Sequence, residues 1–495
     1  MIAAMPVSRS VPAVFCRPLL AVLALLALPM ALADSLPDLG DSSQATLPPA
    51  MEQRIGQSVL NEYRNEPNFV DDAEITGYVD RIGQKLASHI DNPGQSFQFF
   101  VLRDPTLNAF AMPGGYIGVH TGLIAAAESA SELAGVLAHE ISHVTQRHLA
   151  RAFAKQERET VPMMAAMALA ILAARNSSQA GMGGIAALSA GNIQSQLNYS
   201  RSYEQEADRM GLQLLDRSGY DVRGMEAFFQ RLLRFSSLYE GNAPGYLRTH
   251  PLTTDRIADM GNRLEHMQKR TLPDSLDLRL VQAKILATDG QGRDAVIAFQ
   301  AQLREKTYRS ETAAWYGLAL SQLRALNVAG ATQALAELRR GQKADTGIAS
   351  PMIETLAAQV QQKSGDVAGA EATLRAALQR WPENRAVSYA LIGLLQDANK
   401  NDAALRQVKY DQQYWPNDAQ LYLLQAKSYA ARNKQLLQHK SLGEAYALRG
   451  QWSPAIEQFL LAQKAPDGDF FEYSQVDARL RELKQKKAAE ANDKF

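Results

Sequence analysis

Hydrophobic residues in the first half of the chain indicate both strands and a helix. Residues 96–104 (SFQFFVLRD) are rich in aromatic and β-branched side chains, which predicts a β-strand. Residues 108–124 (NAFAMPGGYIGVHTGLI) read as a hairpin that turns at the glycines and proline of 113–115. Together these segments predict a small sheet.

A helix is predicted directly after this sheet. Apolar residues between 133 and 144 recur at intervals of three and four, which is the spacing of one helix face. Ser129 or Ser131 is placed to cap this helix, and Glu132 lies in its first turn, where the helix dipole favours an acid. The chain up to about residue 269 therefore mixes helix, strand and glycine-rich loops.

The second half is almost wholly helical and contains a repeat. The sequences RWPEN and YWPND place Trp381 and Trp415 at an interval of 415 − 381 = 34, the length of a tetratricopeptide unit. Residues of that repeat's packing positions also occur in 441–466: Leu442, Gly443, Tyr446, Ala455, Phe459 and Ala462. Such units stack into an α-solenoid whose concave face binds extended peptides or partner proteins.

Composition gives a broad class but no ligand. The chain has 495 residues, 46% of them hydrophobic and 21% charged, which is enough for at least two domains with cores of their own. Its 52 basic side chains balance its 52 acidic ones. The net charge therefore indicates neither nucleic acid nor an anionic lipid surface as the main partner.

The N-terminus predicts export. Two arginines precede an apolar run at 19–33 (LLAVLALLALPMALA), which ends in the small-x-small pattern that signal peptidase reads, so we expect cleavage after Ala33. The run is about 15 residues long, short of the roughly 20 that cross a bilayer as a helix. Cys16, the single cysteine, lies in the segment that would be removed, so the mature exported protein would have neither disulfides nor a cysteine nucleophile.

The predicted helix carries the candidate chemistry. In GVLAHEISHVTQRHLAR (135–151), His139 and His143 are four residues apart, so both imidazoles can face one metal ion. Glu140, beside the first of them, is placed to take a proton from a zinc-bound water. His148 has no glycine before it to break the helix. On an unbroken helix it points away from the ion, as a surface histidine or one that supports a ligand from behind.

A catalytic zinc usually has three protein ligands and an open position, so a third ligand must come from elsewhere. In NYSRSYEQEADRMGLQLL (198–215), Glu204 and Asp208 lie one turn apart on a predicted helix. Glu204 would bind the ion, and Asp208 would accept a hydrogen bond from a ligating imidazole. Glu206 would point elsewhere. The alternative for this segment alone is a solvated acidic face.

Four ordered motifs resemble the zinc endopeptidases of metallopeptidase family forty-eight, over roughly residues 50–270: NAFAMPGGYIGVHTGLI, ELAGVLAHEISH, EQEADRMG and THPLTTDRI. The resemblance implies one zinc ion per chain, held by His139, His143 and Glu204, with Glu140 as general base. It also implies a mainly α fold, in which a gluzincin-type metallopeptidase domain with a small β-sheet precedes the solenoid of tetratricopeptide repeats.

His250 resembles the family's histidine near the catalytic centre, and two roles fit it. It could donate a hydrogen bond to the oxyanion that forms when water attacks the peptide carbonyl, with Arg256 assisting. Alternatively, its neutral imidazole could occupy the fourth zinc position and hold the enzyme inactive until the loop moves. The sequence leaves both roles open.

The segment before the third ligand suggests a lid. Within residues 161–195, the apolar core from Met163 to Ala174 is about a dozen residues long, too short to span a bilayer. Gly183 and Gly184 flank a second apolar piece. We expect a mobile lid over the active site. The alternatives are peripheral contact with a membrane and a helix packed on the core.

A peptidase of this family joined to repeats in an exported chain resembles the β-barrel assembly-enhancing protease group of the bacterial periplasm. The expected organisation is a signal peptide at 1–33, a zinc metallopeptidase domain at 34–270 and a tetratricopeptide-repeat domain at 275–490. The resemblance implies cleavage of misfolded or stalled outer-membrane proteins, with the repeats recruiting client or assembly machinery. The alternative is a periplasmic chaperone or scaffold with little proteolytic activity.

Overall fold

The computed structural model describes residues 47–92, 94–155, 201–238, 245–344 and 349–492. The predicted signal peptide at 1–33 and the predicted lid, with Met163, Gly183 and Gly184, lie outside the described residues. The described part is mainly helical and contains a small sheet, as the sequence predicts. None of the helices described combines the length and the apolar character that crossing a bilayer requires.

The sheet has three strands among the described residues, with β3 (Tyr116–His120) in the centre. β1 (Gln98–Leu102) runs parallel to β3, and β2 (Ala109–Met112) runs antiparallel to it. The short 3-10 helix η1 (Pro113–Gly115) joins β2 to β3, and its two glycines have φ of 78° and 86°, which glycine adopts without a Cβ clash. The predicted strand is therefore confirmed, and so is the predicted hairpin up to His120; residues 121–124, which were expected to continue it, begin a helix instead.

Helices cover both faces of the sheet because successive strand residues alternate between two hydrophobic clusters. On one face, side chains such as Val101 pack with α4 (Ala73–Ala87) and α6 (Ala130–Thr145). On the other, side chains such as Phe100 pack with α3 (Pro49–Tyr63). The helix that carries the histidines thus lies on the sheet and is shielded from solvent by it.

Local sequence explains where α6 begins and which side it buries. The Oγ of Ser129 caps the helix by accepting a hydrogen bond from the amide of Glu132 at 3.2 Å. The apolar positions predicted between 133 and 141 are fully buried. The capped start and the apolar face of this helix are both as the sequence predicts.

Two further helices pack against α6: α11 (Arg201–Arg217) and α12 (Arg223–Leu238). Gly211 lets α11 come close, because a Cβ at this position would lie 3.2 Å from the backbone nitrogen of His139. The other helices of this half, which we call the sheet half (residues 47–264), are α5 (Thr121–Ala126), α7 (His148–Lys155), α13 (Gly245–Thr249) and α14 (Thr254–Leu264).

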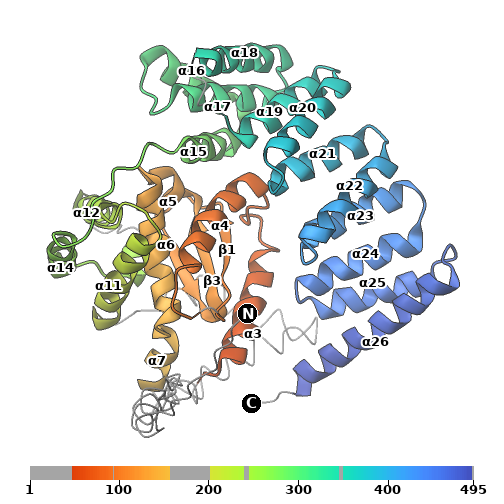
Figure 1. Cartoon of the computed structure of the whole chain (residues 1–495), viewed down its shortest axis with the longest axis horizontal. Helices are drawn as coiled ribbons and strands as arrows, with labels where there is room; N and C mark the ends of the chain where they lie inside the picture. Colours follow the sequence, from red (N-terminus) through yellow and green to blue (C-terminus); the bar gives the residue numbers. More distant parts are fainter. Residues whose placement is uncertain (1–46, 93, 156–200, 239–244, 345–348, 493–495) are drawn as a thin grey trace, which may run out of the picture.

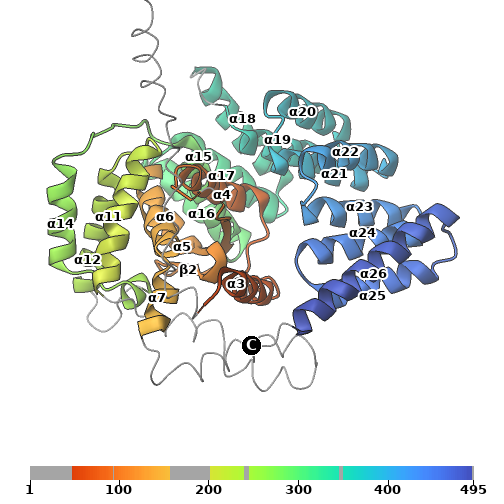
Figure 2. The ribbon, with the colours of Figure 1, turned by 60° about the horizontal axis from the view of Figure 1, so that its bottom comes forward.

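From α15 onward the chain forms consecutive helical hairpins that arch along one side of the sheet half, away from α11, α12 and α14 (Figures 1 and 2). The helices are α15 (Leu276–Thr288), α16 (Gly292–Glu305), α17 (Glu311–Arg324), α18 (Val328–Ala344), α19 (Pro351–Lys363), α20 (Val367–Arg380), α21 (Arg385–Asp397), α22 (Asn401–Tyr414), α23 (Ala419–Ala431), α24 (Gln435–Leu448), α25 (Trp452–Lys464) and α26 (Phe470–Asn492).

The hairpins repeat at the predicted interval. α19, α21 and α23 begin at residues 351, 385 and 419, so 385 − 351 = 419 − 385 = 34. Small residues let paired helices approach, as at Gly443 of α24, where a Cβ would lie 2.6 Å from the ring of Phe459 in α25. The second half is therefore an α-solenoid of tetratricopeptide repeats.

The hydrophobic core does not divide near residue 270, where the sequence predicts a domain boundary. One cluster of buried side chains contains Val79 and Leu137 of the sheet half together with Tyr316 of α17 and Ile353 of α19. The later repeats have clusters of their own around α21 and around α25. The first repeats therefore pack as part of the sheet half, and the predicted boundary stays a prediction.

Candidate metal centre

Five polar side chains meet in the interior between α6, α11 and the turn after α13. α6 carries His139, Glu140 and His143, α11 carries Glu204, and His250 follows the end of α13. Each of the five residues is at most 2% exposed. Polar and charged groups are stable at such positions only when they are paired or bind an ion.

Four of these side chains direct donor atoms to a common point. A ligand atom of each of His139, His143, Glu204 and His250 lies within 4.8 Å of those of the others. Nε2 of His139 lies 3.0 Å from Nε2 of His143, and each lies 3.5 Å from an oxygen of Glu204. Two nitrogens bound to one tetrahedral zinc at about 2.0–2.1 Å would lie roughly 3.3 Å apart. The donor set therefore fits a metal ion of this type.

His250 belongs to this donor set rather than standing beside it. Its Nδ1 lies 3.1 Å from Oε1 of Glu204, and its Nε2 lies 3.6 Å from Oε1 of Glu140. The ring stacks on Tyr246 at a centroid distance of 4.6 Å, which fixes its plane. Of the two roles that the sequence leaves open, this placement favours the fourth metal position.

Asp208 supports the first histidine from behind. Its Oδ1 lies 3.0 Å from Nδ1 of His139, on the side of the ring opposite to the donor set. Arg256 holds the same carboxylate in a fork, with Nε and Nη2 each donating to one oxygen at 2.7 Å. Burial alone would raise the pKa of Asp208, but the hydrogen bonds from Arg256 and His139 lower it. The acid is therefore held as an anion against the ring.

Arg256 has contacts that differ from the predicted ones. Besides its fork on Asp208, its Nη1 lies 2.9 Å from Oε2 of Glu204 and donates to the carbonyl of Pro251 at 2.7 Å. The residue is 2% exposed. Its donors are directed at groups of the protein, and the predicted help to a substrate oxyanion stays a prediction. Arg256 positions the two acids of α11.

Glu140 contrasts with these paired groups. Both of its carboxylate oxygens are buried, and neither accepts a hydrogen bond from any of the residues that the structure describes. A carboxylate held in this way beside a metal donor set is suited to accept a proton from a small molecule such as water. The predicted general base is thus poised next to the predicted ligands.

Neighbouring charges shift the pKa values of the donor set. Burial would raise the pKa of Glu204, but His250 and His139 outweigh it and hold that pKa well below its usual range. Burial would lower the pKa of His139, but the hydrogen bonds with Asp208 and Glu204 raise it to about 9. Burial and the adjacent His139 hold the pKa of His143 well below 6.5. A metal ion therefore competes with a proton for the imidazole of His139.

The prediction that His148 follows an unbroken helix is wrong. α6 ends at Thr145, and Arg147 adopts a left-handed backbone conformation with φ of 52°, which starts α7 in a new direction. His148 is consequently fully buried, and its Nδ1 lies 2.8 Å from Nδ1 of His143. Burial lowers its pKa to about 4. It supports a ligand from behind rather than lying on the surface.

Glu206 is a residue of the site that sequence reasoning missed. Its Oε2 lies 3.3 Å from Nε2 of His148 and 3.0 Å from Nη1 of Arg151. The sequence signal was its position two residues from both Glu204 and Asp208. A partner for it could be recognised only once the break at the end of α6 was known.

The fold and the donor set define a gluzincin-type metallopeptidase domain, in which a histidine pair on one helix meets a glutamate from a second helix. The chain belongs to peptidase family M48, whose family model matches residues 74–264. The resemblance drawn from the four sequence motifs is therefore confirmed.

Within this family the chain is similar to bacterial β-barrel assembly-enhancing proteases. It is 31% identical to that of Yersinia pestis over 452 residues, 91% of this chain and 92% of the relative. It is 37% identical to that of Escherichia coli K12 over 295 residues, 59% of this chain and 60% of the relative. It is also 30% identical to the mitochondrial metalloendopeptidase OMA1 of Bos taurus over 237 residues, 44% of this chain and 41% of the relative.

Proposed function

We propose that this protein is a zinc-dependent endopeptidase in which His139, His143 and Glu204 hold one zinc ion and Glu140 is the general base. The observation that carries the proposal is the buried carboxylate of Glu140, which has no hydrogen-bond partner among the described residues although it lies beside the donor set. Relatives named as proteases and as metalloendopeptidases support the same activity.

Peptide hydrolysis follows from the placement of these groups. A zinc ion, when bound, supplies Lewis-acid activation of water and of the scissile carbonyl. Glu140 takes the proton of the attacking water and delivers it to the leaving amine. Asp208 keeps the ring of His139 oriented, and Arg256 keeps Asp208 ionised and in place. The protein thus contributes orientation and proton transfer.

The edge of the sheet offers a way to hold the substrate. Among the described residues β2 pairs with β3 on one side, which leaves its other side at the edge of the sheet, and α6 packs beside it. An extended polypeptide can add to such an edge through main-chain hydrogen bonds. Recognition would then depend on the backbone more than on side chains, which suits unfolded proteins as substrates.

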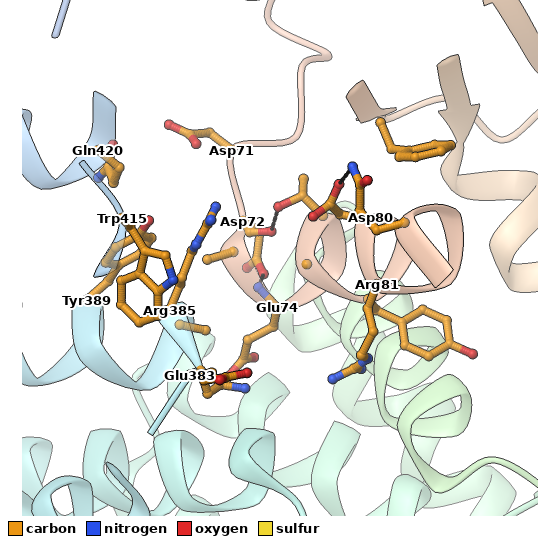
Figure 3. A pocket seen from close by; sticks show the side chains of 18 of the residues that line it. Asp71, Asp72, Glu74, Asp80, Arg81, Glu383, Arg385, Tyr389, Trp415 and Gln420 are labelled. Atoms are coloured by element: carbon orange, nitrogen blue, oxygen red, sulfur yellow. Dashed lines mark hydrogen bonds between the residues drawn. The ribbon is translucent and has the colours of Figure 1, made fainter. Parts of the chain in front are cut away.

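A cleft between the two halves supports a recruiting role for the repeats. It has a volume of about 1390 Å³ and lies between α4 and β1 on one side and α19, α21 and α23 on the other (Figure 3). Trp415 and Tyr389 line the repeat side. Asp71, just before α4, and Glu383, just before α21, both line it, and neither forms an ion pair with a described residue. We infer that this cleft receives an extended client segment.

The cleft proposal is tested by neutralising one acid from each side. The double variant Asp71→Asn, Glu383→Gln should cleave an unfolded outer-membrane barrel protein at least threefold more slowly, while it cleaves a short fluorogenic peptide at the original rate. A matched double variant of two exposed acids, Asp289→Asn just after α15 and Asp294→Asn on α16, should leave both rates unchanged. Equal effects on the long and the short substrate would count against a role for the cleft.

The cellular role proposed is removal of misfolded or stalled outer-membrane proteins in the periplasm. The names of the bacterial relatives support it, because these are proteases that enhance β-barrel assembly. The predicted signal peptide, with cleavage after Ala33, supports export. The repeats would dock onto clients or onto the assembly machinery, as solenoids bind partners along their concave face.

One assay distinguishes this enzyme from a chaperone or scaffold. Casein or an unfolded barrel protein is incubated with the purified protein, with and without a chelator, and in parallel with Glu140→Gln. We expect cleavage that the chelator stops, and a Glu140→Gln variant that retains zinc but does not cut. Suppression of substrate aggregation without any cleavage, at full zinc occupancy, would replace the proposed activity with a holding function.

A further inference from the structure

The two metal-ligating histidines are supported by two parallel sets of side chains. Behind His139 stands Asp208, which is clamped by an arginine. Behind His143 stands His148, which contacts Glu206 at 3.3 Å. Glu206 is in turn clamped by Arg151 at 3.0 Å. Both acids lie on α11 and are two positions apart in the sequence.

We propose that His148 and Glu206 position the ligand His143, as Asp208 positions His139. The inference deepens the proposed function, since it rests on the same metal centre. A histidine that binds a metal through Nε2 carries its proton on Nδ1 and needs an acceptor there. For His143 that acceptor is Nδ1 of His148, at 2.8 Å.

These contacts determine which ring nitrogen carries the proton, first in His143 and then in His148. Because Nδ1 of His148 accepts a hydrogen bond, its proton lies on Nε2, and Nε2 donates to Oε2 of Glu206. The ring of His148 also stacks on Tyr203, with a centroid distance of 4.8 Å and an angle of 14° between the planes. It is therefore held in both plane and tautomer, and it passes that orientation to His143.

The break in the helix is what makes this support possible. On a continuous α6, position 148 would be rotated away from position 143. The left-handed conformation of Arg147 turns the chain. Nη2 of Arg147 donates a hydrogen bond to the carbonyl oxygen of Leu47 at 2.6 Å, and this bond holds the turn in place. A non-glycine residue adopts this conformation at a cost, so the packing around it must impose the turn.

Zinc affinity, measured by competition with a chromogenic chelator at fixed pH, tests the proposal. His148→Phe keeps a ring on Tyr203 but removes the acceptor, and should weaken zinc binding about 10–100-fold. His148→Asn restores an acceptor at the position of Nδ1 and should recover most of that loss. The exposed His89→Asn is the control and should bind as the original does. The absorption spectrum of the Co²⁺ form should change in His148→Phe and return in His148→Asn.

A second variant keeps the proposal testable if His148→Phe does not fold. Glu206→Leu leaves the ring of His148 in place without its anchor and should weaken zinc binding about tenfold, while Glu206→Gln, which can still accept from Nε2, should not. Zinc affinity within twofold of the original in both His148→Phe and Glu206→Leu would overturn the inference. Normal zinc binding without any proteolysis in the unsubstituted protein would instead count against the proposed function alone.

Discussion

Glu204 is the residue that joins the two helices of the metal centre. It lies between the imidazoles of His139 and His143, at 3.5 Å from each, and Arg256 steadies its second oxygen. Burial would raise its pKa, but the interactions with His250 and His139 hold it well below the usual range, which favours the anion. A neutral replacement would leave two imidazoles without a counter-ligand.

Glu204→Ala should therefore lose the metal. We expect the zinc content of the purified protein to fall from about one ion per chain to below a tenth, because the donor set loses its one carboxylate. Elemental analysis after dialysis measures it. Glu226→Ala, on the neighbouring helix α12, is the control and should retain the ion. Zinc retained undiminished in Glu204→Ala would show that another residue completes the site.

His250→Ala separates the two roles that the sequence leaves open. Because His250 lies within the donor set, we expect its removal to open the fourth position and raise peptidase activity. The rise is about tenfold if the ring blocks the site in nine of ten molecules. Initial rates on casein, normalised to bound zinc, measure the effect. A fall of tenfold to a thousandfold would instead assign the ring to stabilisation of the oxyanion.

The spacing of residues in the sequence was sufficient to predict part of this site. His139 and His143 could be paired because residues four apart share a helix face whatever the tertiary structure. Glu204 is 204 − 143 = 61 positions further on. Its place one turn from Asp208 made it a candidate, and the family resemblance favoured a ligand over a solvated acidic face. For His148 the sequence left two roles open, a surface histidine or a support for a ligand. The helix break that decides between them could not be predicted, since a break at an arginine leaves no glycine or proline in the sequence to mark it.

At the scale of elements, the N-terminus of α4 joins the sheet half to the first repeats. We call the contacts of Asp72 and Glu74 with α15, α17 and α19 the joint. Glu74 accepts hydrogen bonds from Tyr316 of α17 and Thr355 of α19, and it pairs with Lys284 of α15 at 2.6 Å. Lys284 also pairs with Asp72, at 2.7 Å. Burial would lower the pKa of Lys284, but Glu74 and Asp72 outweigh it and raise the pKa above 10.5.

Lys284→Met should loosen this joint. Removing one partner of a buried ion pair leaves the others uncompensated, and we expect the free energy of unfolding to fall by about 3 kcal/mol. Denaturant titration followed by tryptophan fluorescence measures it. The exposed Lys409→Met of α22 should change it by less than about 0.5 kcal/mol. No difference between the two variants would mean that the joint contributes nothing to stability.

The raised pKa gives this joint a pH dependence of known sign. A lysine whose folded pKa lies above its unfolded value contributes its full stabilisation below the unfolded pKa, near 10.5. The contribution is lost as the pH rises through the higher folded value. The stability difference between the original protein and Lys284→Met should therefore be constant between pH 7 and pH 9 and shrink above about pH 10.5.

Elements were predictable wherever one local pattern decided them. β1 follows from its aromatic and β-branched residues, the hairpin from the proline and two glycines at its turn, and α6 from its cap and its apolar face. The repeats were visible through the interval between Trp381 and Trp415. The docking of α15, α17 and α19 onto α4 was not predictable, because it depends on Glu74 and Lys284, which are 210 positions apart in the sequence.

At the scale of the whole molecule, hydrophobic packing and the repeat pattern divide the chain at different places. The cluster that surrounds the metal centre continues through α15, α17 and α19, whereas α21 and α25 belong to separate clusters. The four tryptophans are distributed over these three clusters. Trp315 packs on the cluster shared with the sheet half, Trp381 and Trp415 on the second cluster, and Trp452 on the last.

Metal binding should therefore stabilise one end of the solenoid and not the other. Zinc in excess of its dissociation constant by about 100-fold adds about 2.7 kcal/mol to any unit that unfolds together with the site. We expect a variant whose single tryptophan is Trp315 to lose about 5 °C from its unfolding midpoint when zinc is chelated. A variant whose single tryptophan is Trp452 should lose less than about 1 °C.

Glu204→Ala in the Trp315 background is the control, since without a site the chelator should have no effect. Equal shifts of the unfolding midpoint at Trp315 and Trp452 would mean that all the repeats unfold together with the sheet half. A client bound at the last repeats would then be coupled directly to the catalytic centre. The expected difference means instead that the last repeats open independently. They can then change shape around a partner while the cluster that holds the metal ligands stays closed.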